Sequence, residues 1–135
     1  MQNVVGEWRG HFLKDHQNLC RKCSYGQTCY VRFKKEDRYY ILLGPGEDLF
    51  LLVKEPICNV GNALSLYYID LPHRGQHVFP YELKVITHEN FITSSVQLNS
   101  QAVSIKEWKR GEVRGTYLLV PLGFTEQNIE VQVCL

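Results

Sequence analysis

Several signals that often identify a protein are absent from this sequence. No stretch approaches the roughly 18 consecutive apolar residues of a membrane-spanning helix. The N-terminal residues MQNVVGEWRG lack the basic region and apolar core of a signal peptide. Cys134 is the penultimate residue, so no prenylation box is expected. We therefore expect an intracellular protein, cytoplasmic or nuclear, whose 5 cysteines are thiols or metal ligands rather than disulfides.

Signatures of catalysis are equally scarce. No GxSxG nucleophile elbow is present. Cys58 with His11 or His16 as base would be a thiol nucleophile, but the glycine-framed sequence around a protease cysteine is missing, and a two-barrel protease needs a longer chain. No paired carboxylates fall at inward strand positions. We therefore expect a protein that is not an enzyme.

The sequence also lacks a convincing helical window, because its apolar residues recur with a period of two rather than 3.6. Connectors such as 88–90, 99–101 and 109–112 are short, which favours antiparallel neighbours. Gly44-Pro45-Gly46-Glu47 is a strong turn signal. The segments that we predict to be strands are 4–13, 28–35, 38–43, 48–53, 63–71, 81–87, 91–98, 102–108, 113–120 and 129–135.

These strands predict one all-β domain over residues 1–135. It is a single antiparallel β-barrel or β-sandwich of about ten short strands with little or no helix. We expect 28–35, 38–43 and 48–53 at its centre. The segments 38–43 and 48–53 are apolar almost throughout, so both of their faces should be covered. The last strand should have an exposed edge that could pair with another chain.

An irregular cysteine-containing loop at about 14–27 interrupts this pattern. Cys20 and Cys23 have the spacing with which two thiolates can bind one tetrahedral zinc. With His16 and Cys29 they form a candidate Cys3His zinc site. In the alternative interpretation all three cysteines are simple thiols, and Cys29 faces the core.

The charge distribution suggests a second kind of site, although the net charge is only +1. Residues 1–38 hold eight basic and four acidic side chains, so any electrostatic footprint lies near the start of the chain. Alternation along 28–35 turns aromatic and basic side chains outward, where they could stack bases and contact phosphates. The alternative is a solvated outer face. The candidate nucleic-acid or partner-binding residues are Arg21, Lys22, Tyr25, Tyr30, Arg32, Lys34, Lys35 and Arg38.

The first predicted strand contains Gly6-Glu7-Trp8-Arg9-Gly10. A Gly-x-Trp near the start of a β-rich chain of 135 residues resembles the opening of calycin barrels such as lipocalins and fatty-acid-binding proteins. The resemblance implies that Trp8 closes one barrel end against a late basic residue, Arg114, around a small apolar ligand. The later lipocalin motif and the Arg and Tyr pair of the fatty-acid-binding proteins are not recognisable. In the alternative interpretation Trp8 is an ordinary core residue.

Three functions follow in order of preference. The first is a non-catalytic intracellular β-domain acting as a protein-interaction or self-assembly module, without a cofactor. The second is a nucleic-acid-binding protein that uses the basic and aromatic face near 21–38, with a zinc knuckle as a further option. The third is a calycin-like carrier of a small apolar ligand.

Overall fold

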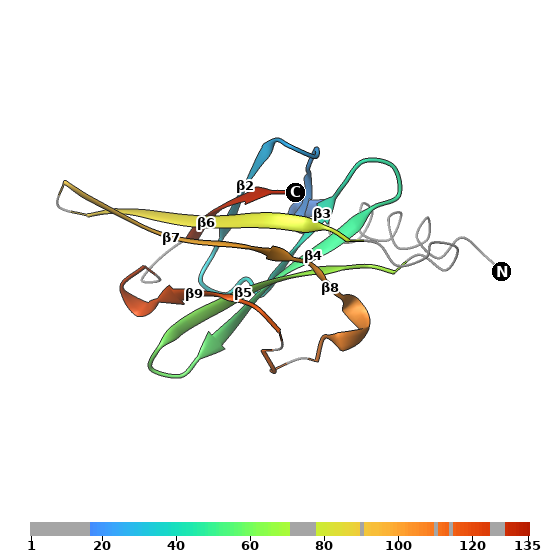
Figure 1. Cartoon of the computed structure of the whole chain (residues 1–135). Coiled ribbons are helices and arrows are strands. Elements are labelled where there is room, and N and C mark those ends of the chain that lie inside the picture. The colour runs from blue at the N-terminus through green and yellow to red at the C-terminus, as the bar shows by residue number, and fades with distance from the viewer. Residues whose placement is uncertain (1–16, 71–77, 90, 110, 114, 125–128) are drawn as a thin grey trace.

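The computed structural model describes residues 17–70, 78–89, 91–109, 111–113, 115–124 and 129–135. Its strands form two sheets that pack face to face (Figure 1). Sheet A contains β1 (Cys20–Lys22), β3 (Tyr39–Leu43), β4 (Leu49–Ile57), β5 (Gly61–Tyr68), β8 (Val103–Ser104) and β9 (Leu118–Pro121). Sheet B contains β2 (Thr28–Phe33), β6 (Pro80–Glu89), β7 (Ile92–Gln101) and β10 (Ile129–Cys134).

Helix is confined, among the described residues, to three single turns of 3₁₀ type, η1 (Gln17–Leu19), η2 (Ile105–Glu107) and η3 (Leu122–Phe124). None of these turns has the length needed to cross a membrane. The all-β prediction is therefore confirmed. Of the two architectures it left open, the described strands form two sheets rather than a closed barrel.

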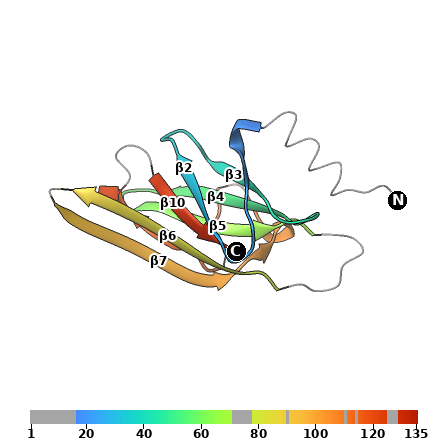
Figure 2. The same ribbon diagram turned by 90° about the horizontal axis from the view of Figure 1, so that it is seen from above.

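Pairing is mostly antiparallel, as the short connectors predicted. Sheet A has the order β1-β3-β4-β5, and β8 and β9 both pair with the far edge of β5 at different points along it. Sheet B has the order β2-β10-β6-β7, which Figure 2 shows from above. The parallel pairs within the described chain, β1 with β3 and β5 with β8, extend over three residues and two residues.

The predicted positions of the strands within the sheets need correction. β4 is central in sheet A, but β2 lies at an edge of sheet B. The last strand, β10, lies between β2 and β6 and has no open edge, so it cannot accept another chain. Order within a sheet depends on long-range packing that local alternation does not contain.

Two predicted strands are much shorter than expected. Only Val103–Ser104 of 102–108 is a strand, because the Ser104 hydroxyl accepts a 3.2 Å hydrogen bond from the Lys106 N–H and starts the turn η2. Within the described part of 113–120, a strand forms only from Leu118, and it extends to Pro121. The predicted strand 4–13 lies outside the described residues.

The core lies between the sheets and follows the alternation of the strands. Val31 and Phe33 of β2 face inward with Val131 and Val133 of β10, and all four are fully buried. Phe33 also packs edge-on against Tyr40 at 4.9 Å between ring centroids. These contacts join the edge strand of sheet B to β3 of sheet A.

The strands β3 and β4 bury both faces, as their apolar sequence predicted. Leu42 and Phe50 face the main core, whereas Ile41, Leu43 and Leu49 form a second cluster on the outer face of sheet A. Each of these five side chains is 2% exposed or less. A continuous apolar run is therefore the consequence of two separate clusters that share the same strands.

Gly61 marks the point where β5 passes closest to β9. Its φ is +154°, and a Cβ there would lie 2.0 Å from the Val120 carbonyl oxygen. That oxygen belongs to the backbone of a paired strand, so it cannot move aside without breaking the β5–β9 pairing.

We predict that Gly61→Ala lowers the free energy of unfolding by at least about 2 kcal/mol, because the added methyl group clashes with backbone. Urea unfolding followed by circular dichroism measures the loss. Gly123→Ala is the matched control, since nothing lies within 4 Å of the Cβ position there. Equal stabilities of the two variants would contradict the close approach.

Candidate functional site

The cysteine-containing segment crosses from sheet A to sheet B. Cys20, in β1, packs against the outer cluster of sheet A, whereas Cys23 is buried in the main core. The two thiols of the Cys-x2-Cys motif therefore belong to opposite faces of sheet A. Cys29 turns inward from β2 and packs against the same core as Cys23.

Cys23 and Cys29 form a coupled pair. A hydrogen bond from Cys23 lowers the pKa of Cys29 against the opposing effect of burial, and the Arg21 guanidinium lowers it further. The same hydrogen bond, with burial, raises the pKa of Cys23. Cys29 therefore carries the thiolate of the pair as the pH rises, and Cys23 acts as the donor.

The zinc prediction stays a prediction. No three His, Cys, Asp or Glu side chains of the described chain converge in a way that could hold a metal ion. His16, the fourth proposed ligand, lies outside the described residues. The structure brings together two of the four candidates, Cys23 and Cys29, and sets Cys20 apart.

The candidate basic and aromatic residues fall into separate groups. Tyr30 and Arg32 point outward from β2 with Lys34 just beyond it, as predicted. The Arg32 guanidinium lies 3.7 Å from the Glu130 carboxylate of the neighbouring strand, so part of the positive charge of Arg32 is offset. Lys22 is exposed at the far end of β1.

Other members of this candidate set are held by local contacts. The Arg21 guanidinium donates to the Cys20 carbonyl at 2.8 Å and lies 5.2 Å from the Tyr40 ring centroid. The Tyr25 hydroxyl donates to the Asp48 carboxylate. Lys35 and Arg38 lie elsewhere, in a cleft at one end of the sandwich. A single continuous nucleic-acid face is therefore not assembled by these residues, and nucleic-acid binding stays a prediction.

The cleft has a volume of about 350 Å³ and opens where the β2–β3 connection meets the β4–β5 turn. Its described lining residues contain three cations and no carboxylate. They are Lys35, Arg38, Lys54, Pro56, Ile57, Cys58, Asn59, Gly61, Asn62, Leu122 and Ile129. Cys58 is exposed at this site.

Lys54 is the feature of the cleft that the sequence analysis missed. It is only 4% exposed, and its ammonium donates to the carbonyls of Lys34 and Lys35 at 2.9 and 3.1 Å. Burial, followed by repulsion from Arg38, lowers the pKa of Lys54. The signal was present in the period of β4, since a lysine two residues after Leu52 must face inward.

A second surface is the outer edge of sheet B. β7 pairs with β6 along its whole length, and no other described strand pairs with it. Its sequence, ITSSVQLNSQ, contains no charge and no proline over ten residues. Charge and proline are the usual devices that keep an edge strand from pairing with another chain, and β7 has neither.

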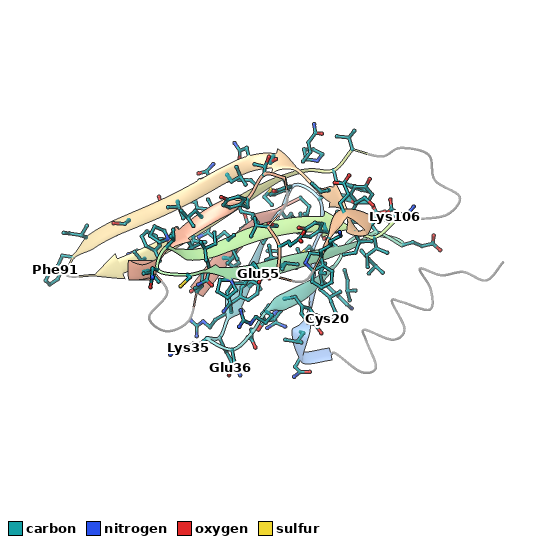
Figure 3. All side chains as sticks on the ribbon, turned by 90° about the horizontal axis from the view of Figure 1, so that it is seen from below. Cys20, Lys35, Glu36, Glu55, Phe91 and Lys106 are labelled. Carbon is teal, nitrogen blue, oxygen red and sulfur yellow. The ribbon has the colours of Figure 1, made fainter. Side chains whose placement is uncertain are left out.

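The turn that joins β6 to β7 presents an apolar tip. The hairpin projects beyond the other strands, and Phe91 at its end points away from the molecule (Figure 3). Phe91 is fully exposed with a φ of +65°, and Ile92 beside it is 66% exposed. A bulky residue at positive φ is strained, and such positions cluster at functional surfaces.

The chain matches no protein-family model, and no curated protein is significantly similar to it. Function must therefore be inferred from the geometry of these surfaces. The calycin interpretation finds no support in that geometry, because calycins are closed barrels, whereas the described strands form two separate sheets. Its signature residues, 6–10 and Arg114, lie outside the described residues.

We predict that the Cys23 donor sets the titration of Cys29. Cys23→Val removes the hydrogen bond and leaves burial as the largest remaining effect, so the pKa of Cys29 should rise and its alkylation should require a higher pH. The pH midpoint of iodoacetamide labelling of Cys29, followed by mass spectrometry, measures this shift independently of access. Cys23→Ser retains a donor and should keep the midpoint low. Identical midpoints in the valine and serine variants would contradict the coupling.

Proposed function

We propose that this chain is a non-catalytic, intracellular protein-interaction domain that self-associates by pairing β7 of one copy with β7 of a second copy. The uncharged edge of β7, with which no described strand other than β6 pairs, carries the proposal. An unpaired edge strand offers backbone N–H and C=O groups to any extended strand that can reach it. Ten residues without charge or proline are longer than the average strand and provide a full set of such groups.

A second copy suits this edge because of what each side chain would meet. Directly opposed residues of an antiparallel pair lie on the same face of the sheet, so a two-fold axis at Gln97 sets Val96 opposite Leu98 of the second copy. Both side chains are half-buried at the margin of the core. Pairing would cover the apolar surface that each still exposes.

The outward face of β7 is equally compatible with self-pairing. In the same register Ser95 meets Asn99 of the second copy, and Gln97 meets its own counterpart. Like charges opposed across a symmetric pair are destabilising, and this strand has none. Ile92 would lie opposite Ala102 of the second copy, which brings the exposed apolar tip to the end of the new contact.

Because the register specifies which residues face each other, self-pairing can be tested with variants of opposite charge. We predict that the triple variant S95K/Q97K/N99K raises the dimer dissociation constant by about ten- to a hundredfold, because each lysine would face another lysine. The variant S95E/Q97E/N99E should behave in the same way. An equimolar mixture of the two should restore a dimer, since lysine then faces glutamate. Analytical ultracentrifugation measures all three samples.

The control places the same added charge elsewhere. N18K/S24K/Q27K introduces three lysines at exposed positions before β2 and should dimerise like the wild type. Wild-type protein that remains monomeric at millimolar concentration would refute self-association. A dimer that survives both triple variants of β7 would show that a different surface is used.

A further inference from the structure

The cleft at the end of the sandwich contains a buried cation that forms no ion pair with any described residue. Lys54 is buried, and within the described residues no carboxylate lies within ion-pair distance of it. An ammonium group has three N–H donors, and two of those of Lys54 are used by the Lys34 and Lys35 carbonyls. The ammonium also lies over the Phe33 ring, 5.5 Å from its centroid. One N–H donor remains in a largely desolvated position, where a charge without an ion-pair partner is costly.

Two further cations lie near Lys54. Arg38 and Lys35 line the same cleft, and both side chains are exposed to solvent. The acidic side chains whose charges favour the protonated form of Lys54 are Asp37 and Glu36, and neither lines the cleft. The Asp37 carboxylate accepts hydrogen bonds from the Lys34 N–H at 2.9 Å and from the Tyr40 hydroxyl at 3.1 Å, which fix its position and leave its negative charge in place. Asp37 and Glu36 therefore offset part of the charge of Lys54 from outside, whereas the described lining of the cleft itself contains three cations and no carboxylate.

We propose that this cleft binds a small phosphorylated molecule, with its phosphoryl group held between Lys54, Lys35 and Arg38. A phosphomonoester dianion matches a group of three cations better than a carboxylate does, and the arginine fork can bind two of its oxygens. The volume of about 350 Å³ is in the range of small-molecule sites. The remaining lining, including Pro56, Ile57 and Leu122, supplies an apolar wall for the rest of the molecule.

This site is independent of the β7 edge. The cleft is formed by the β2–β3 connection, the end of β4 and the start of β5, and none of its lining residues belongs to β7. Figure 3 shows Lys35 on the lower side of the molecule in that view, away from the hairpin tip at Phe91. Failure of the dimerisation experiment would leave the anion site untouched, and the reverse also holds.

The direct test uses AMP, with adenosine as the uncharged counterpart. Isothermal titration calorimetry on the full chain should detect AMP binding and no adenosine binding. The variant K35Q/R38Q should weaken AMP binding at least tenfold, because two charge-assisted contacts to the phosphoryl group are lost. Both positions are exposed, so the fold should be retained, and circular dichroism checks this.

The matched control, K106Q/K109Q, removes the same charge at two exposed lysines outside the cleft. It should bind AMP like the wild type. Equal losses in the two double variants would show a general charge effect and overturn the site. Equal binding of AMP and adenosine would also overturn it, as would binding restricted to polyanions such as heparin.

Cys58 provides a second readout that needs no bound ligand. This thiol is exposed in the cleft, so its reaction rates with an anionic disulfide, 5,5′-dithiobis(2-nitrobenzoate), and a neutral one, 4,4′-dithiodipyridine, report the local potential. The rate with the anionic disulfide divided by the rate with the neutral one should fall about tenfold in K35Q/R38Q and stay unchanged in K106Q/K109Q. Subtracting the rates measured with Cys58→Ser corrects for the reaction of the other four cysteines. An unchanged ratio in K35Q/R38Q would show that the cations do not act on the cleft.

Discussion

The interior position of β10 is the constraint on which the rest of the structure depends. This strand pairs antiparallel with β2 on one side and β6 on the other, and so joins the beginning of the described chain to its end. Its inward residues Val131 and Val133 are fully buried. Because β10 fills the middle of sheet B, β2 and β7 become the edges. The start of β10 also brings Ile129 to the β4–β5 turn and completes the cleft.

The two edges of sheet B are protected to different extents. At β2 the outward Arg32 is paired with Glu130, and the Gly26 N–H donates to the Leu135 carbonyl at 2.9 Å, so the incoming chain is tied across the end of the neighbouring strand. Arg32 and Lys34 leave charges along this edge. β7 has no comparable device. The contrast within one sheet is the physical reason to place an interaction at β7 rather than at β2.

Local alternation predicted most of the strands because burial on one face imposes a period of two, as in Cys29, Val31 and Phe33. It failed at 102–108, where the Ser104 hydroxyl supports a turn that apolar spacing does not reveal. Local alternation could not predict the strand order, because the pairing of β2 with β10 joins residues that lie far apart in the sequence. The site was predicted only in part. Lys35 and Arg38 were named for their charge, whereas the cleft that they share with Lys54 depends on how the two sheets meet.

The buried Lys54, three residues before the end of β4, has a physical explanation that involves the cleft. The carbonyls of Lys34 and Lys35 lie in the β2–β3 turn, and a donor from β4 must extend from the inner face of sheet A to reach them. Lysine has the length to do so, and its ammonium group lies over the Phe33 ring, 5.5 Å from the ring centroid. The group that reaches the carbonyls is a charged ammonium, and the two neutral carbonyls accept its hydrogen bonds without neutralising it. The contact that secures the turn therefore also places a positive charge at the cleft, where we propose that an anion binds.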